Sequence, residues 1–394
     1  MPLPGEQTGE KPGLASDLQG ASRLTVDAVL GVTSLVEAMH RNIGSASSLA
    51  GVAPVGPTTG ITGLVYRSVR SVSRAVGMGL DVALGALVPL LAERPRWPAR
   101  EAVLSALNGV LGDHLDATAN PLAIPMSLRR HEEQAAVTGK VLVLVHGLCM
   151  NDHQWLRDGH EHGLMLADEL AYTPVYLHYN SGRHISVNGR QFAQTLEEML
   201  SAWPVPVEQL VIMGHSMGGL VARSAAHYAA EAGLAWPRQL AALVFLGTPH
   251  HGAPLERVGS VIDMLLGSTP YSAPLARIGL VRSAGIQDLR HGNVIDEHWG
   301  RRRPSAANQL HLPPDVPCFA IAAVQGGSTQ RLKNKLLGDG LVTVDSALGR
   351  HARASHSLCI PQKNTFLLTQ TDHFGLLSSK AAGVQLAKWL GALR

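Results

Sequence analysis

The chain has 394 residues, and its 33 Lys and Arg outnumber its 30 Asp and Glu only slightly, for a formal net charge of +3. Hydrophobic residues make up 45% and charged residues 16%, which suits a globular chain with a sizeable core rather than a disordered one. The charge excess is too small to argue for nucleic acid as a partner, and no basic motif joined to aromatic residues appears.

The N-terminal third is predicted to be a polar tail followed by helices. Residues 1–20 are rich in Gly, Pro and polar side chains and are predicted to be disordered. Residues 21–112 carry apolar side chains at helical spacing, interrupted by a Gly/Ser/Pro break at 42–60. The first residues show neither the basic nor the apolar region of a signal peptide, so a cytoplasmic location is expected.

One stretch of this region, Ala75 to Ala92, is mostly apolar with a single internal Asp81. Three interpretations stay open: a helix packed against a partner helix or the rest of the chain, which we favour; a helix lying in a membrane interface; and a membrane span. An ionisable residue in the middle of so short a stretch argues against the span.

A compact catalytic domain is predicted over residues 138–394, and its first signal is a serine between a strand and a helix. Gly214-His215-Ser216-Met217-Gly218 follows the apolar run Leu210–Met213 and precedes the helix-like stretch Leu220–Ala232. This G-x-S-x-G pattern in that context is typical of a nucleophile elbow, in which a strained turn exposes the serine hydroxyl. Ser216 is therefore the predicted nucleophile of a hydrolase.

An oxyanion hole is predicted beside it. Lys140–Val145 is a continuous apolar run, typical of a strand buried on both faces, and it ends in His146-Gly147-Leu148. The main-chain N–H groups of Leu148 and Met217 are the expected donors to a developing oxyanion.

The general base and its acid partner should follow in the order Ser, Asp, His. Ser357–Ile360 is predicted to be the last strand, and His373 is then the histidine beyond it, before a helix over Ser378–Leu393. Asp339, between two glycines after the predicted strand Cys318–Val324, is the favoured acid, with Asp345 as the alternative.

The segment at about 253–312 leaves the strand pattern and is predicted to be a lid or cap. Its apolar side chains would face an acyl chain or form only a packing face: Leu255, Val261, Ile262, Met264 and Leu265.

No cofactor or metal is expected. The chain has no phosphate-binding loop and no dinucleotide fingerprint. His160-Glu161-His162 is predicted to be a surface loop, because histidines two positions apart do not share one face of a helix. Cys318 and Cys359 are predicted to be buried free thiols in core strands.

These motifs resemble the α/β-hydrolase superfamily, and within it the bacterial lipase and PGAP1-like esterase group. The pieces that carry the resemblance are Val145–Leu148, Gly214–Gly219, Leu246-Gly247-Thr248-Pro249-His250-His251-Gly252 and Gly338–Val342, and it covers roughly residues 138–394. It implies an α/β-hydrolase fold with a mostly parallel sheet and a lid insertion, to which the helical spacing of residues 21–112 adds an N-terminal helical region.

The resemblance also implies a carboxyl-ester substrate and a Ser216-Asp339-His373 triad that works through an acyl-enzyme. Phe374-Gly375-Leu376 follows His373 where related secreted lipases carry a calcium-binding aspartate, so calcium dependence is not implied. The alternatives are an acyltransferase with the same triad and an inactive lipid-associated scaffold. The expected partner is an ester or lipid substrate, with peripheral membrane association through the N-terminal helices as a further option.

Overall fold

The computed structural model describes residues 14–45, 60–87, 98–131, 137–253, 283–299, 310–326 and 338–393. The chain divides into two compact units. The helical unit comprises Thr8–Arg96 and Ala117–Ala123, and the sheet unit comprises Met1–Gln7, Trp97–Asp116 and Ile124–Arg394.

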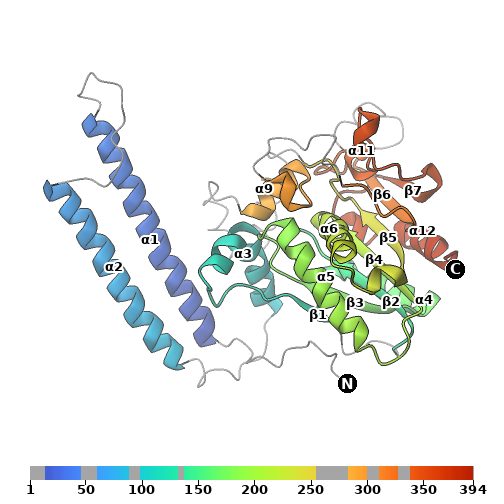
Figure 1. Ribbon diagram of the computed structural model, residues 1–394, viewed down its shortest axis with the longest axis horizontal. Helices are drawn as coiled ribbons and strands as arrows, with labels where there is room; N and C mark the ends of the chain where they lie inside the picture. Colours follow the sequence, from blue (N-terminus) through green and yellow to red (C-terminus); the bar gives the residue numbers. More distant parts are fainter. Residues whose placement is uncertain are drawn as a thin grey trace. The chain divides into compact units, whose positions relative to one another are not determined.

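The helical unit is built on two long helices, α1 (Leu14–Ser45) and α2 (Gly60–Leu87), which lie side by side (Figure 1). Glu37 of α1 and Arg70 of α2 form an ion pair, and Tyr66 is buried. The helix α1 already includes residues 14–20, which were predicted to be disordered, and residues 1–13 of that tail lie outside the described part. Among the described helices, none combines the length and the apolar character that crossing a membrane requires.

The sheet unit is organised around a seven-stranded sheet with the order β1-β3-β2-β4-β5-β6-β7. The strands are β1 (Ser127–Arg129), β2 (Lys140–Val145), β3 (Thr173–His178), β4 (Gln209–His215), β5 (Leu240–Leu246), β6 (Cys318–Val324) and β7 (Thr365–Thr369). Only β1 runs antiparallel to its neighbour. The central strands are nearly continuous apolar runs because helices cover both faces of the sheet.

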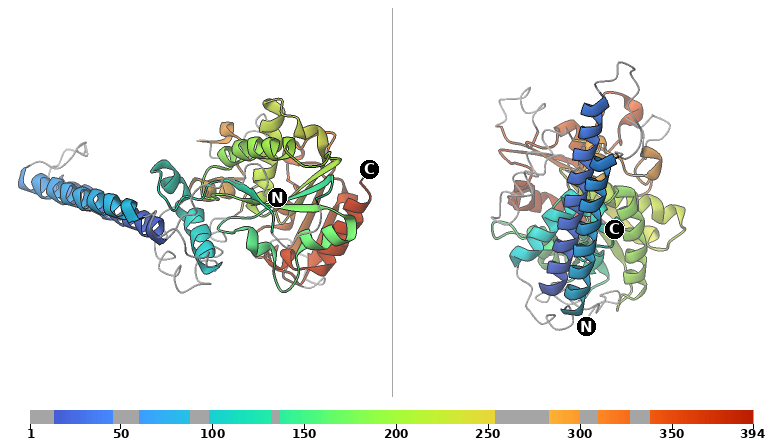
Figure 2. Two further views of the ribbon diagram at one scale, coloured as in Figure 1. Left: turned by 90° about the horizontal axis from the view of Figure 1, so that it is seen from below. Right: turned by 90° about the vertical axis from the view of Figure 1, so that its left-hand side faces the viewer.

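Helices α5 and α6 cover one face and α4 and α12 the other (Figures 1 and 2). The described α-helices of this unit are α3 (Pro98–Ala117), α4 (His162–Leu170), α5 (Ile185–Ser201), α6 (Met217–Glu231), α9 (Ala284–His291), α11 (Val344–Ala347) and α12 (Lys380–Gly391). Short 3-10 turns lie at Asp152–Trp155 (η1), Trp236–Gln239, Asp296–His298, Ala354–His356, Gln362–Asn364 and Gly375–Leu377.

This arrangement, with a sharp turn between central strand β4 and helix α6, is the predicted α/β-hydrolase fold. The predicted boundary near residue 138 differs from the observed division. Most of α3 and all of β1 precede that boundary and belong to the sheet unit.

Three local predictions were wrong. Ser357–Ile360 is not a strand; the last strand is β7, and Cys359 is exposed rather than buried. The run is short and lacks the length that would separate a strand from an apolar loop. His160-Glu161-His162 is not a surface loop, because Glu161 is buried and His162 is fully buried, with its Nε2 2.9 Å from the carbonyl oxygen of Leu376.

Of the predicted lid or cap, residues 254–282 and 300–309 lie outside the described residues, and so do the five apolar residues expected to face an acyl chain. The described part between them contains α9, whose Leu289 is buried.

Candidate active site

Ser216 stands at a strained turn between β4 and α6. Its backbone has φ 54° and ψ −124°, a conformation that side-chain-bearing residues adopt rarely. Its main-chain N–H donates to the carbonyl oxygen of Leu246, which ties the turn to β5 at 2.9 Å. Strain of this kind persists only where the surrounding structure holds it, and it occurs often at functional sites.

The glycines that flank Ser216 are required by close packing of the turn. A Cβ on Gly214 would lie 2.4 Å from the nitrogen of Gly219, and one on Gly218 would lie 2.1 Å from the carbonyl oxygen of Val145. Because both obstacles are backbone atoms, neither position can accept a larger residue without moving the sheet or the helix.

His373 and Asp339 form a buried pair next to this turn. His373 Nδ1 donates to Asp339 Oδ2 at 2.7 Å, and both side chains are nearly inaccessible to solvent. The other carboxylate oxygen, Oδ1, accepts the N–H groups of Leu341 at 2.9 Å and Val342 at 2.7 Å. The glycine-flanked loop therefore holds the carboxylate in one orientation and presents Oδ2 to the imidazole.

The alternative acid is placed elsewhere. Asp345 lies in α11, directly after its first residue, and its carbonyl oxygen accepts the N–H of Arg350. The carboxylate that the structure brings against His373 is that of Asp339.

His373 and Ser216 line one small cavity. His373 Nε2 is buried and makes no hydrogen bond to the described residues. Both Ser216 and His373 line a cavity of about 10 Å³, together with Leu148, Met150, His215, Leu289, Leu341 and Phe374. An imidazole nitrogen in this position can accept a proton from a neighbouring hydroxyl.

The two expected oxyanion donors come from two segments next to the serine, the start of α6 and the loop after β2. Met217 begins α6, so its N–H is at a helix N-terminus, where main-chain donors lack intrahelical partners. Leu148 lies on the loop after β2, and a Cβ on the preceding Gly147 would come within 3.1 Å of Ser216 Cβ. The loop after β2 and the turn at Ser216 are therefore packed so closely that a side chain at Gly147 would crowd Ser216.

His215 supports the site, and the sequence reasoning gave it no role. Its Nε2 lies 3.1 Å from the carbonyl oxygen of His373, so the ring donates there and holds the main chain of the candidate base. Burial, with His373 nearby, keeps the pKa of His215 well below its usual value, so this ring stays neutral. Its place as the variable residue before the serine of the G-x-S-x-G pattern was the only signal that could have drawn attention to it.

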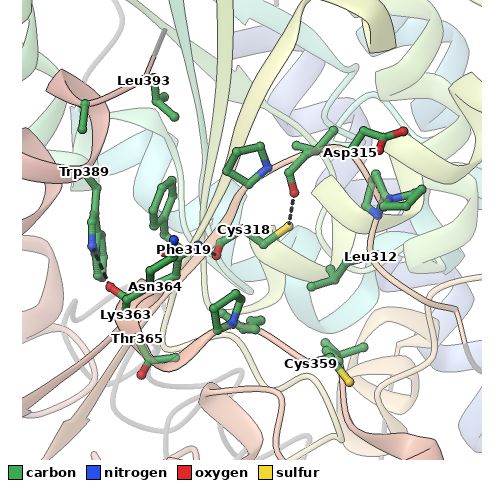
Figure 3. A pocket seen from close by; sticks show the side chains of 18 of the residues that line it. Leu312, Asp315, Cys318, Phe319, Cys359, Lys363, Asn364, Thr365, Trp389 and Leu393 are labelled. Carbon is green, nitrogen blue, oxygen red and sulfur yellow. Dashed lines mark hydrogen bonds between the residues drawn. The ribbon is translucent and has the colours of Figure 1, made fainter.

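A much larger cavity lies apart from these residues. It measures about 1060 Å³ and lies between the start of β6, the segment after residue 310 and α12. Figure 3 shows Cys318, Phe319 and Trp389 in its wall. Its size does not bear on the chemistry at Ser216, because none of the predicted catalytic and oxyanion residues lines it: Leu148, Ser216, Met217, Asp339 and His373.

Comparisons with known proteins give one match to a family model and several distant structural likenesses. A family model described as a domain of unknown function, DUF7379, matches residues 114–286, and no curated protein matches the chain. The solved structure of the mature lipase BlEst2 from Bacillus licheniformis is similar, with 18% identity, a TM-score of 0.42, and coverage of 68% of this chain and 97% of that one.

Two further solved structures are similar. A thermophilic esterase is 17% identical, with a TM-score of 0.40 and coverage of 68% of this chain and 94% of that one. An esterase from Pyrococcus furiosus is 14% identical, with a TM-score of 0.40 and coverage of 68% and 91%. At these identities, what those proteins act on is not transferred to this chain.

Proposed function

We propose that the protein is a serine carboxyl-ester hydrolase, an esterase or lipase. One observation carries the proposal: Ser216, in strained elbow geometry, lines one cavity with His373, whose Nδ1 is bound to a carboxylate and whose Nε2 has no hydrogen-bond partner among the described residues. Acyl transfer through a serine requires a serine nucleophile, a histidine base and a carboxylate that orients the histidine.

The proposed reaction begins with attack of Ser216 Oγ on the acyl carbon. His373 Nε2 takes the hydroxyl proton as the C–O bond forms, and Asp339 stabilises the resulting imidazolium. The N–H groups of Leu148 and Met217 hold the oxyanion. The tetrahedral intermediate then collapses, the ester C–O bond breaks, and His373 returns the proton to the leaving alcohol. Water attacks the acyl-enzyme by the same route and frees Ser216.

The residues that line the cavity favour an apolar acyl group in the substrate. Besides Ser216, His215 and His373, its lining is apolar, and it includes Leu148, Leu289 and Leu341. Its volume of about 10 Å³ is close to that of a single water, so a substrate needs a wider opening than the described residues leave.

An acyltransferase would share the first half of this reaction, with an alcohol or thiol in place of water. A lipid-associated scaffold without activity is disfavoured by the ordered pair of His373 and Asp339, which a packing role does not need. The placement in the bacterial lipase and PGAP1-like esterase group rests on the sequence motifs alone.

Peripheral contact with a membrane is a subsidiary proposal for the helical unit. Among the described side chains of α2, five large apolar ones are each at least 41% exposed: Leu64, Val65, Val69, Val72 and Met78. Arg67 and Arg74 of the same helix are exposed. A helix with exposed apolar and basic side chains suits a lipid surface.

The test is a panel of p-nitrophenyl esters from short to long acyl chains, assayed with wild type and Ser216→Ala. Ser224→Ala is the matched control, because Ser224 is a buried serine of the same helix α6. We expect turnover in wild type and Ser224→Ala and its loss in Ser216→Ala. Hydrolysis of none of the esters by wild type, or equal hydrolysis by all three proteins, would reject the proposal. Addition of an alcohol acceptor, with the products identified, separates hydrolysis from acyl transfer.

A further inference from the structure

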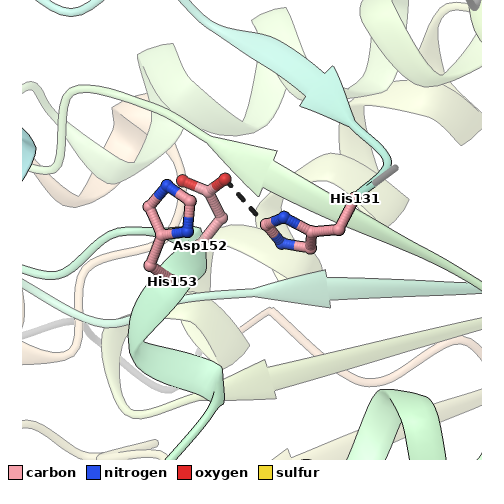
Figure 4. Close-up of side chains that lie close together, drawn as sticks. All are labelled: His131, Asp152 and His153. Carbon is pink, nitrogen blue, oxygen red and sulfur yellow. Dashed lines mark ion pairs between the residues drawn. The ribbon is translucent and has the colours of Figure 1, made fainter. Parts of the chain in front are cut away.

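A second group of chemically capable side chains lies between β1 and η1. His131 follows β1 by two residues, and Asp152 and His153 are the first two residues of η1. Figure 4 shows the three side chains gathered together from these two segments. One ligand atom from each residue lies within 4.8 Å of those from the other two.

We propose that His131, Asp152 and His153 bind one divalent transition-metal ion of the Zn²⁺ class. Two imidazoles and one carboxylate form a donor set that zinc and its neighbours in the periodic table accept, whereas calcium and magnesium prefer oxygen ligands alone. The inference is independent of the ester chemistry proposed for Ser216.

The distances are compatible with closure around an ion. Asp152 Oδ2 lies 4.0 Å from His131 Nε2. In a tetrahedral site with bonds of about 2.0–2.1 Å, neighbouring ligand atoms are roughly 3.3 Å apart. The rings can supply the remaining movement, because the side chains of His131 and His153 are 32% and 56% exposed.

One carboxylate oxygen of Asp152, Oδ1, contacts buried partners, and the other, Oδ2, lies toward His131. Its side chain is 2% exposed, and its Oδ1 lies 3.3 Å from an Arg129 nitrogen and 3.2 Å from His178 Nδ1. Such outer contacts orient a carboxylate ligand and are common behind metal sites. The ring of His178 is itself buried, and its Nδ1 meets Asp152 outside hydrogen-bonding geometry.

The charges around Asp152 favour a cation on the solvent side. Arg129 lies 3.3 Å from both Asp152 and Glu101, so one guanidinium faces two carboxylates. The buried trio Glu101, Asp152 and His178 also has ligand atoms within 4.8 Å of one another. Within that trio Arg129 donates to Glu101 and to Asp152 Oδ1, which leaves Asp152 Oδ2 as the oxygen for an ion bound with His131 and His153.

The expected role is structural. Asp152 begins η1, four positions after Leu148, and Leu148 lies on the loop that joins β2 to η1. An ion at this place would join the end of β1 to η1 and restrict the loop that carries the Leu148 donor. Binding of a metal to the folded state alone raises the melting temperature by mass action.

The experiment titrates Zn²⁺ into EDTA-treated, dialysed full-length protein by isothermal calorimetry. We expect one specific site in wild type. Its affinity should fall by at least roughly 10- to 100-fold in His131→Ala and in His153→Ala, as losses around metal ligands commonly do. The double variant should show neither that site nor the rise in melting temperature that Zn²⁺ produces in wild type.

His227→Ala is the matched control, because the chain has 19 histidines and a half-buried ring elsewhere tests non-specific binding. It should bind Zn²⁺ as wild type does. Circular dichroism checks the fold of each variant, and His131→Gln with His153→Gln replaces the alanine pair if that pair does not fold. Absence of a specific site in wild type, or the same site retained in a folded double variant, would overturn the inference.

Discussion

His373 and Asp339, 34 positions apart in the chain, are joined twice. The imidazole Nδ1 donates to the carboxylate Oδ2 at 2.7 Å, and the main-chain N–H of His373 donates to the carbonyl oxygen of Asp339 at 3.2 Å. The main-chain hydrogen bond fixes the position of the His373 backbone, and the side-chain hydrogen bond fixes the rotation of the imidazole ring. Together they determine where Nε2 points, which is the property that a general base at Ser216 needs.

Ser216→Ala should reduce kcat by roughly four to six decades, because the nucleophile is lost while binding is kept. A fluorophosphonate probe followed by mass spectrometry should label wild type at Ser216 alone. Labelling at another serine, or undiminished turnover of the variant, would remove Ser216 from the mechanism.

Asp339→Asn should lower kcat by roughly 10⁴, as in the serine-protease case where the same change stabilises the wrong tautomer of the histidine. Asp345→Asn is the control and should lower kcat far less, because Asp345 lies in α11 and the carboxylate bound to His373 is that of Asp339. Steady-state assays on a short p-nitrophenyl ester measure both. The reverse ranking would transfer the acid role to Asp345.

Ester hydrolysis should survive EDTA at temperatures below the melting transition. The proposed chemistry uses only Ser216, His373, Asp339 and main-chain donors, and no metal enters it. Activity and melting temperature are measured before and after chelation and after return of Ca²⁺ or Zn²⁺. A loss of activity in the folded protein that Ca²⁺ restores would reveal a metal in the reaction itself.

A protein that begins near Gly139 should be insoluble or much less stable than the full chain. It would lack β1 and α3, whose buried side chains include Leu107, Leu111 and Leu115. It would also lose the hydrogen bond from Ser283 to the carbonyl oxygen of Gly109 at 2.6 Å. An apolar surface exposed in this way promotes aggregation.

A protein that begins at Trp97 is the matched control, because it keeps α3 and β1 and lacks α1 and α2. Solubility, thermal melting and liposome sedimentation are compared for both truncations and the full chain. A soluble, active protein starting at Gly139, together with liposome binding of the full chain, would show that the N-terminal helices anchor the protein rather than stabilise it.

The free energy of unfolding should fall as the pH drops below about 6.5. Burial lowers the pKa most strongly in five histidines of the folded state: His146 to about 3, His162 and His251 to about 4, and His215 and His250 well below their usual value. Below about pH 6.5, the ordinary pKa of histidine, these rings bind protons in the unfolded chain but stay neutral in the folded protein. The part of the folding free energy that is present above pH 6.5 is therefore lost on acidification.

Each of these rings lowers the free energy of unfolding by at most about 1.4 kcal/mol for each pH unit of acidification. The hydrogen bond to Asp288 raises the pKa of His184 and acts in the opposite direction. Urea unfolding at pH 7.5 and pH 5.5 should therefore show a decrease of about 2 kcal/mol or more, with a shallower pH dependence in His162→Gln. Equal stability at the two pH values would contradict the neutral, buried state of these rings.

Local features of the site were readable from the sequence because they depend on neighbours along the chain. The elbow at Ser216 needs only a buried strand, two glycines and a helix in succession, and the structure has β4, Gly214, Gly218 and α6 there. The strands β2 and β6 were equally clear, since a parallel strand buried on both faces is a continuous apolar run.

Features that depend on residues far apart were decided by the tertiary structure. The sequence left Asp339 and Asp345 as alternatives, and only the folded loop presents one carboxylate to His373. It placed the last strand at Ser357–Ile360, where β7 instead pairs with β6 a few residues later. It could not bring His131 to Asp152, because contacts across 21 positions follow from how β1 pairs with β3 and not from local spacing.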